Sequence, residues 1–301
     1  MASLLDLTSQ GDVGTITDES KLSSVTLMDP QQLYELWERQ PWSAHAIDLT
    51  QDKADWAALP AADRDHISWN LSSFFVGEER VATQFSGLVR AYESQGEEAF
   101  LTTQQVDEVR HAQHFDRFYA QVVGYDGTFE HRLEQARGDV VPAFVELFDE
   151  HLVEAQELLL SDPTDLIAKV DFVVLYHMLI EGTLALTGQY FLTEYLERRD
   201  ILPGFLEGFR KISQDEHRHV AYGTWYLQSK VREDRRWAEH IQRRLLELLP
   251  VTAGVLVPPG KSIDDDYEVL GFSKDETNAF AFTALSRRLK VMGVDLMAAA
   301  A

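Results

Sequence analysis

The feature that most constrains this chain is a pair of Glu-x-x-His strings, over Glu108–His111 and Glu216–His219. Each string lies in a segment whose apolar spacing predicts a helix. Residues three apart share one face of a helix, so each string directs one carboxylate and one imidazole the same way. Four helices that combine two such pairs with two further glutamates can hold two metal ions. The strings therefore predict a helical bundle around a metal centre.

Four predicted helices each carry an apolar stripe that ionisable side chains interrupt near its middle. In the first of them Phe74, Val81 and Leu88 follow helical spacing, and Glu78 is the charged residue on that line. A buried carboxylate without a partner costs several kcal/mol or changes its pKa. The side chains that interrupt the four stripes are Glu78, Glu108, His111, His177, Glu181, Glu216 and His219.

Four buried glutamates require compensating positive charge. Two divalent ions supply four charges if both histidines of the strings are neutral. Oxygen-rich sites with one imidazole per metal suit iron or manganese better than the closed ligand set of structural zinc. We therefore predict a dinuclear site, with the ligands Glu78, Glu108, His111, Glu181, Glu216 and His219.

The periodicity predicts an all-α protein of one domain over 1–301. We expect a polar, irregular N-terminal arm over 1–60, a helical core over 61–250, and a loop with one helix over 251–301. Proline, glycine and aspartate at the ends of periodic segments set the helix limits. The expected core helices span roughly 63–95, 97–123, 139–160, 165–199, 203–231 and 234–249, and nothing is typical of a sheet.

Composition excludes several classes of site. The chain has no cysteine, which rules out disulfides, iron–sulfur clusters and zinc–thiolate sites. Its formal net charge of −23 argues against binding to nucleic acid or to an anionic membrane. The first 19 residues do not have the pattern of a signal peptide, and the apolar runs over 170–180 and 245–257 are too short and interrupted to span a bilayer. We expect a cytoplasmic protein.

The chain resembles the ferritin-like superfamily that includes the ribonucleotide reductase small subunit, and within it the ligand-binding oxidases. The resemblance covers about residues 42–250, and its most specific parts are Gly77–Val81 and Tyr176–Ala185. It implies a ferritin-like bundle with a four-helix core, and a manganese/iron pair, or alternatively two irons, that activates dioxygen. It also implies a bound long-chain fatty acid or other apolar molecule, and a homodimer.

The resemblance also implies roles for individual residues. Its first site, usually manganese, corresponds to Glu78, Glu108 and His111. Its second site, usually iron, corresponds to Glu181, Glu216 and His219, with Glu108 as the bridge.

The oxidases also form an ether bond between a tyrosine and a valine, at positions that match Tyr176 and Val81. A tertiary valine carbon gives a relatively stable radical, so it is a sensible target for a strong oxidant. Taken alone, Val81 is an ordinary core residue and Tyr176 a buried aromatic side chain with a hydrogen bond.

Three histidines depart from the pattern or lie beside it. His177 replaces a small amide residue one turn before Glu181, and it either bonds to that glutamate or adds a nitrogen ligand. His114 follows His111 by three positions and is more typical of a packed histidine than of a ligand. His217 points about 100° away from Glu216 on a helix, which indicates a structural role.

Two other functions remain open on the sequence. A ribonucleotide reductase small subunit is the first, although Phe115 stands where that family usually has its radical tyrosine, and no tyrosine follows Tyr267 to relay a radical. One subclass with phenylalanine works through a manganese/iron pair, so Phe115 alone does not decide. The second is a non-catalytic metal-storage bundle.

An apolar ligand needs a tunnel beside the metals. Candidate walls are Phe75, Val81, Phe115, Leu184 and Phe191. For each of them, plain core packing is the simpler explanation.

Overall fold

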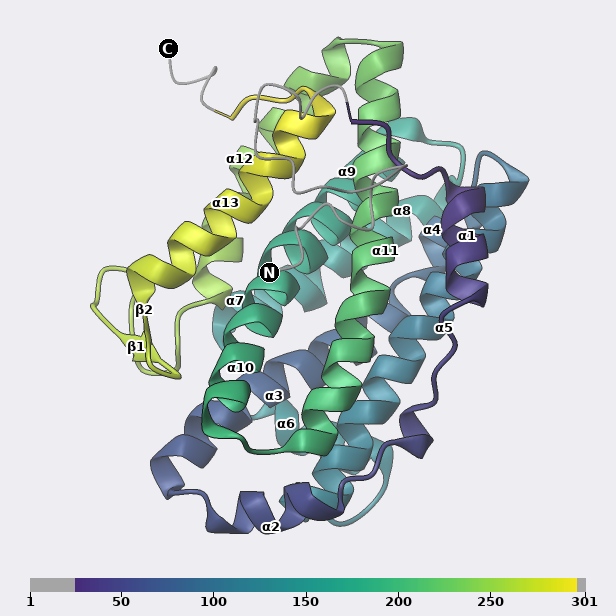
Figure 1. Cartoon of the computed structure of the whole chain (residues 1–301). Coiled ribbons are helices and arrows are strands. Elements are labelled where there is room, and N and C mark those ends of the chain that lie inside the picture. The colour runs from purple at the N-terminus through teal and green to yellow at the C-terminus, as the bar shows by residue number, and fades with distance from the viewer. Residues whose placement is uncertain (1–24, 297–301) are drawn as a thin grey trace.

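The computed structural model describes residues 25–296, and four long helical rods form its core. They are α3 (Ala61–Thr83), α5 (Gln95–Phe118), the continuous rod over 166–199 that contains α9 (Leu166–Val173) and α10 (Leu186–Arg199), and α11 (Pro203–Glu233). Helix α11 runs through most of the length of the molecule (Figure 1). The predicted all-α bundle is confirmed.

Local sequence signals set the ends of these rods. The Ser94 hydroxyl accepts a hydrogen bond from the Glu97 backbone N–H and so caps the start of α5. The rod continues as a π-helical turn over Tyr119–Val123 and ends at Gly124, whose φ of 86° favours glycine. Asp165 caps α9 in the same way, through the N–H groups of Ile167 and Ala168.

The middle of the 166–199 rod is π-helical, over Val174–Ala185. Such insertions are rare and often occur at functional sites. The Thr183 hydroxyl donates to the Met178 carbonyl at 2.7 Å. A Cβ on Gly182 would lie 2.6 Å from the His177 carbonyl oxygen, so the tight backbone here needs glycine. This segment carries Tyr176, His177 and Glu181.

The expected single helix over 63–95 is wrong. Helix α3 ends at Thr83, a short helix α4 follows over Ser86–Arg90, and Ser94 then begins α5. Phe85, at the break, is fully buried against Phe172 and Tyr176. Beyond α4, Tyr92 is 45% exposed.

The N-terminal arm is also more regular than predicted. Within 1–60, α1 (Pro30–Glu38) and α2 (Thr50–Ala58) are helical, and residues 1–24 lie outside the described part of the chain. Asp29 and Gln32 form a reciprocal capping box at the start of α1. Helix α1 packs along α5, which brings this arm to the outer side of the core (Figure 1).

The remaining helices cover the core. Helix α12 continues past Pro250 to Val255, beyond the predicted limit of 249, and the helix α6 was not predicted. Strands of two residues each pair across a turn, Glu268 with Ser273 and Val269 with Phe272, and form a small hairpin. The expectation of no sheet is therefore wrong at this one place. The covering elements are α6 (Phe129–Arg137), α7 (Pro142–Val145), α8 (Leu152–Ser161), α12 (Arg236–Val255), β1 (Glu268–Val269), β2 (Phe272–Ser273) and α13 (Lys274–Met292).

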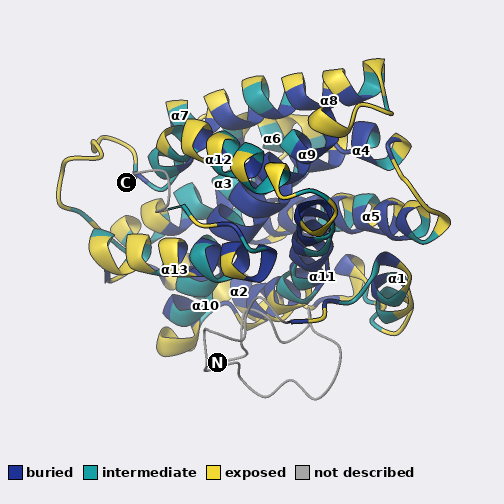
Figure 2. Ribbon diagram, turned by 90° about the horizontal axis from the view of Figure 1, so that it is seen from above, coloured by how far each residue is buried: buried dark blue, intermediate teal, exposed yellow. Residues whose placement is uncertain are grey.

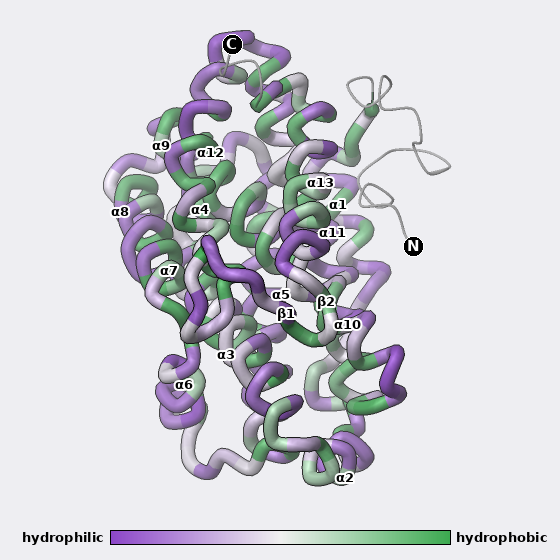
Figure 3. The backbone as a smooth tube through the Cα atoms, turned by 90° about the vertical axis from the view of Figure 1, so that its left-hand side faces the viewer, coloured by the Kyte–Doolittle hydropathy of each residue, from purple (hydrophilic) through white to green (hydrophobic). Residues whose placement is uncertain are grey.

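Burial separates the rods from their cover. Helix α11 is buried along most of its length, whereas α8, α12 and α13 expose their outer faces (Figure 2). Hydrophilic and hydrophobic segments alternate along α8 and α12 (Figure 3), as expected for amphipathic helices. The rod over Leu166–Arg199 is long and apolar enough to cross a membrane, but 83% of its apolar window is buried inside the protein. Its apolar character is therefore that of a core helix.

Candidate metal centre

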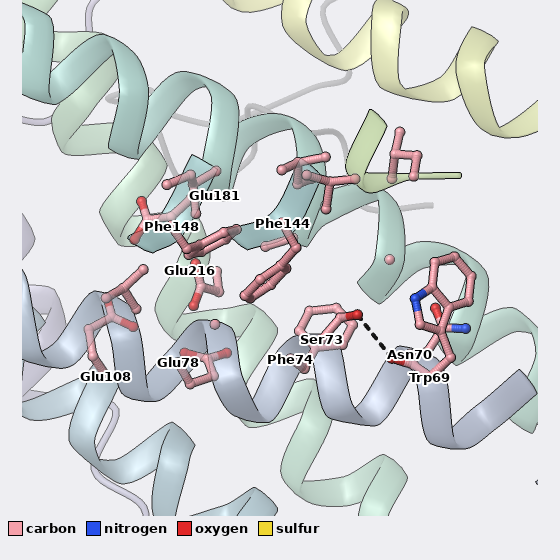
Figure 4. A pocket seen from close by; sticks show the side chains of 18 residues that line it. Trp69, Asn70, Ser73, Phe74, Glu78, Glu108, Phe144, Phe148, Glu181 and Glu216 are labelled. Atoms are coloured by element: carbon pink, nitrogen blue, oxygen red, sulfur yellow. Dashed lines mark hydrogen bonds between the residues drawn. The ribbon is translucent and has the colours of Figure 1, made fainter. Parts of the chain in front are cut away.

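Six side chains from four rods meet in the core and form two overlapping groups. The first consists of Glu78, Glu108, His111 and Glu216, and the second of Glu108, Glu181, Glu216 and His219. Within each group, one ligand atom per residue lies within 4.8 Å of the others, and every residue is buried. Figure 4 shows the four carboxylates gathered at one end of a cavity. The groups share two glutamates, which is the arrangement that a bridged ion pair requires.

His111 directs its Nδ1 atom at the first group. This nitrogen lies 3.3 Å from Glu78 Oε2, 3.4 Å from Glu108 Oε2 and 3.3 Å from Glu216 Oε1. One imidazole nitrogen and three carboxylate oxygens thus surround a common point. This donor set suits manganese or iron.

His219 does the same for the second group. Its Nδ1 atom lies 3.1 Å from Glu108 Oε1, 3.4 Å from Glu181 Oε1 and 3.8 Å from Glu216 Oε2. The two oxygens of Glu108 therefore face different histidines, and so do the two oxygens of Glu216. The family resemblance implies Glu108 as the bridge, and in the structure Glu216 also belongs to both groups.

The charges in this cluster are unbalanced without cations. Burial raises the pKa of Glu78 to about 8, and burial together with Glu216 holds the pKa of Glu181 well above its usual range. Burial opposes protonation of His111 and His219, but the facing glutamates raise their pKa values well above 6.5. Without metal, these raised pKa values favour protons on the glutamates and imidazoles, which offset the negative charge of the cluster.

Several polar atoms at the centre have no hydrogen-bond partner although they are buried. They are Glu108 Oε2, Glu181 Oε2, Glu216 Oε2 and His219 Nδ1. Unpaired buried polar atoms are costly, and metal coordination is one way to satisfy them. The residues present therefore fit a pair of divalent ions.

Two aspartates hold the far nitrogens of the imidazoles. His111 Nε2 lies 3.2 Å from Asp215 Oδ2, and His219 Nε2 lies 3.3 Å from Asp107 Oδ2. A carboxylate on Nε2 favours a proton there and leaves Nδ1 free to bind a metal. Burial opposes ionisation of Asp215, but the hydrogen bond from His111 and the charge of Arg218 lower its pKa to about 2.

Arg218 ties the two aspartates together. It is fully buried and donates to Asp107 Oδ2 at 3.0 Å and to Asp215 Oδ1 at 2.5 Å. The indole N–H groups of Trp37 and Trp42 donate to Asp107 and Asp215 respectively. This network joins the N-terminal arm to the metal centre.

The sequence analysis missed these supporting residues, although the signal was present. Each Glu-x-x-His string extends to Asp-Glu-x-Arg-His, over Asp107–His111 and Asp215–His219. The aspartate precedes the glutamate, and the arginine precedes the histidine, in both copies. Arg110 also reaches both aspartates, at 2.9 Å and 3.4 Å. The longer repeat predicts this symmetry. The tryptophans carry no such signal.

Tyr176 and Val81 lie at the edge of the centre. The Tyr176 hydroxyl donates to Glu108 Oε1 at 2.8 Å, and burial with the charge of Glu108 holds its pKa well above 10. Val81 follows Glu78 on the same helix face, is 4% exposed, and lines the cavity that Glu108 also lines.

The additional histidines differ in placement. His177 is buried and pairs with Glu181 only through Gln104: His177 Nε2 lies 3.3 Å from Gln104 Oε1, and Gln104 Nε2 donates to Glu181 at 3.0 Å. The expected direct bond to Glu181 is replaced by this amide. His114 is fully buried among aromatic rings, and burial lowers its pKa to about 3. His217 Nδ1 contacts the Ser213 carbonyl on its own helix.

An apolar cavity opens beside the four carboxylates. The cavity is narrow, with a volume of about 100 Å³. Trp69 and Asn70 lie at the end away from the acids (Figure 4). Of the predicted walls, Val81 and Leu184 line it; Phe75, Phe115 and Phe191 pack elsewhere in the described core. The walls that were not predicted include Phe74, Phe144, Phe148, Ile180, Val255 and Leu256.

Comparisons with known proteins agree with this site. The sequence model of the family described as ribonucleotide reductase, small chain, matches residues 22–295. A solved R2-like ligand-binding oxidase, a tyrosine-to-phenylalanine variant with an aerobically reconstituted Mn/Fe cofactor, is 25% identical. The match covers 89% of this chain and 93% of that one, with a TM-score of 0.73. A glycine-to-phenylalanine variant with an anaerobically reconstituted Mn/Fe cofactor matches at 25% identity over 89% and 94%, also with a TM-score of 0.73.

Proposed function

The chain belongs to the ribonucleotide reductase small-chain family and is similar to R2-like ligand-binding oxidases, so it is a dimetal oxidoreductase. We propose that it is an oxidase that acts on C–H bonds. The proposed enzyme uses dioxygen and a manganese/iron pair, or alternatively two irons, to oxidise C–H bonds. The observation that carries the proposal is the pair of overlapping ligand groups that share Glu108 and Glu216 beside an apolar cavity.

In this proposal the first ion, manganese, takes Glu78, Glu108 and His111. The second ion, iron, takes Glu181, Glu216 and His219. Glu108 would be shared by both ions, and Glu216, which lies 3.3 Å from His111 Nδ1 and 3.8 Å from His219 Nδ1, belongs to both ligand groups as well. Bound together, the ions supply the redox chemistry that activates dioxygen.

The chain's own residues position and protect this chemistry. Asp107 and Asp215 fix the orientation and tautomer of the two imidazoles, and Arg110 and Arg218 together balance the charge of both aspartates. The aromatic walls exclude water from the face of the carboxylates that opens to the cavity. A substrate held in the cavity would present its C–H bonds at the end where the acids gather.

The ligand we propose is a long-chain fatty acid or a similar apolar molecule. The support is the nature of the cavity, whose walls are mostly aromatic and aliphatic side chains and whose inner end carries the four glutamates. A carboxylate headgroup suits the cations at that inner end, and an acyl chain suits the apolar walls. Extraction of purified protein with organic solvent, followed by mass spectrometry, tests this directly.

We also propose that Tyr176 and Val81 become joined by an ether bond. The O–H bond of the phenol and the Cβ–H bond of Val81 break as the C–O bond forms, which releases two protons and two electrons. Dioxygen would accept these two electrons, together with two from the metal ions, and would be reduced to water. Support comes from the position of the Tyr176 oxygen, 2.8 Å from Glu108, and from the place of Val81 in the wall beside the same glutamate.

The experiment loads metal-free protein with Mn(II) and Fe(II) without oxygen and then exposes it to air. We expect two ions per chain, a new absorption band on exposure to air, and a peptide pair joined through residues 81 and 176. Tyr176→Phe is the matched control, which should keep both ions and lose the joined peptides. Uptake and release of metal with no oxygen-dependent band would instead identify a storage protein.

We further infer a cytoplasmic homodimer. A protein without cysteine needs no oxidising compartment for disulfides, which is consistent with the cytoplasm. Sedimentation equilibrium of the metal-loaded protein tests the dimer, since a monomer would have half of the predicted mass.

A further inference from the structure

A second buried group of ionisable side chains lies outside the metal centre. We call it the Tyr/Lys/Glu cluster, and its members are Glu93, Glu97, Lys169, Tyr222, Tyr226 and Lys230. Lys169 is 1% exposed and donates to Glu93 at 3.0 Å and to Glu97 at 2.7 Å. Lys230 donates to Glu93 at 2.8 Å. Apolar residues would fill this space at lower desolvation cost, so packing alone does not explain why these residues are charged.

Each tyrosine of the cluster has its own carboxylate. The Tyr222 hydroxyl donates to Glu97 Oε1, and the Tyr226 hydroxyl donates to Glu93 Oε1 at 2.9 Å. Burial, with the charge of Glu97, holds the pKa of Tyr222 well above 10, so the resting phenol is protonated. A phenol that gives up an electron becomes strongly acidic, and here a carboxylate lies ready to accept the proton.

A continuous series of aromatic rings joins the cluster to the metal centre. Ring centroids are 4.8 Å apart between Tyr176 and His177, 5.2 Å between His177 and Tyr222, and 6.1 Å between Tyr222 and Tyr226. At the inner end Tyr176 hydrogen-bonds to Glu108. Neighbouring rings are thus in or near van der Waals contact throughout.

The inner end has a second connection. Gln104 links His177 to Glu181 through two hydrogen bonds, at 3.3 Å and 3.0 Å. This connection does not use the Tyr176 hydroxyl, so it persists if that oxygen is joined to Val81.

The outer end reaches the surface. The Glu93 side chain is 39% exposed, whereas Lys169, Tyr222 and Tyr226 are each buried. Two carboxylates, Glu93 and Glu97, face two ammonium groups, so the cluster as a whole is close to neutral. An electron therefore crosses it without meeting a large net charge.

We propose that Tyr222 and Tyr226 form a one-electron relay that carries electrons from the surface near Glu93 to the oxidised metal centre. This rests on the proposed function, which supplies the oxidant. Tyr222 gives one electron inward and its phenol proton to Glu97. Tyr226 then reduces the Tyr222 radical, passing its own proton to Glu93, while Tyr222 recovers its proton from Glu97. A one-electron reductant in solution restores Tyr226, whose proton returns from Glu93.

The test compares Tyr222→Phe and Tyr226→Phe with a control, Tyr190→Phe, whose ring stacks on Phe280 away from the relay. Each protein is loaded with manganese and iron, oxidised by air, and reduced with ascorbate. We expect ascorbate to reduce the oxidised centre more slowly in both relay variants and at the wild-type rate in the control. Freeze-quench electron paramagnetic resonance should show a tyrosyl radical accumulating in Tyr226→Phe and absent from Tyr222→Phe.

The absorption band of the oxidised centre separates failure of the relay from failure of the proposed function. No band in wild-type protein contradicts the oxidase itself. A band that decays equally fast in all four proteins, or no tyrosyl signal in Tyr226→Phe, overturns the relay. If Tyr222→Phe does not fold, fluorotyrosine at position 222 keeps the shape of the ring, and its radical must then show fluorine hyperfine splitting.

Discussion

The two sides of the metal centre are built from opposite kinds of side chain. On the imidazole side, two aspartates, two arginines and two tryptophans form a buried hydrogen-bonded network behind the histidines. On the cavity side, the carboxylates face aromatic and aliphatic walls, and several of their oxygens have no partner. The first side fixes where ions bind. The second side leaves carboxylate oxygens unpaired beside an apolar cavity.

This difference shows how a helical bundle divides its tasks. Charge placed behind the histidines orients the ligands, because the aspartates there bond to the imidazoles, the tryptophans and the guanidinium groups. Apolar residues placed in front keep the reacting face dry without competing for the metals. The account therefore expects substitutions on the imidazole side to affect metal binding and stability, and those on the cavity side to affect the ligand.

The largest effect should come from Arg218→Met. The change removes the fully buried cation and leaves Asp107 and Asp215 with Arg110 and the two imidazoles as partners. Breaking a buried ion pair costs about 3–5 kcal/mol. Urea denaturation of the metal-free protein measures the loss. Arg210→Met is the control, since Arg210 is exposed in its pair with Glu197 and should cost about 0–1 kcal/mol. Equal losses in the two variants would contradict the comparison.

Asp215→Asn should have the next largest effect, and on one ion only. The amide keeps the shape of the side chain but weakens its hold on His111 Nε2, so the first site should lose about 10–100-fold in affinity. The mirror change Asp107→Asn should weaken the second site, at His219, by a similar factor. Metal competition titrations read out each site. A loss shared equally by both sites in either variant would rule out separate support for each imidazole.

Gly77→Leu should disturb the cavity side alone. A Cβ at Gly77 would lie 3.7 Å from the Phe148 ring, so Gly77→Ala is tolerated, whereas leucine projects into the cavity. We expect loss of the bound apolar molecule and about 1–3 kcal/mol of stability, with both ions retained. Mass spectrometry of extracted ligand and metal analysis check this result. Retention of the ligand in Gly77→Leu would show that it binds elsewhere.

Metal affinity should also depend on pH, and no substitution is needed to test this. Burial raises the pKa of Glu78 to about 8 without metal, so below that pH an incoming ion must displace a proton. Apparent affinity should rise as pH approaches about 8, by about tenfold per unit for each displaced proton. The unfolded chain releases this proton at lower pH, near 4.5, so the metal-free protein should lose stability between about 4.5 and 8. Calorimetric titration of the protein with metal at several pH values measures this affinity. A fall in affinity as the pH rises toward 8 would contradict the prediction.

Helical spacing predicted the rods and the convergence of their charged faces. Glu78, Glu108, Glu181 and Glu216 stand in apolar stripes, and in the structure these stripes do meet around a common point. The period of a helix carries this information because only one face of each rod can be buried. The assignment of the six residues as ligands stays a prediction that metal loading must test.

Other features could not be predicted because they depend on contacts distant in sequence. Trp42 reaches Asp215 across 173 residues, and Lys169 reaches Glu97 across 72. The helix break near Phe85 follows from packing against Tyr176, which local propensity does not encode. The π-helical segment likewise alters the spacing that periodicity assumes.

Anomalous diffraction at the manganese and iron edges tests the central claim most directly, on crystals of protein supplied with both ions. The account predicts two neighbouring peaks, one enclosed by Glu78, Glu108 and His111 and the other by Glu181, Glu216 and His219. A single peak, peaks at other residues, or an acid cluster that binds neither metal would contradict it.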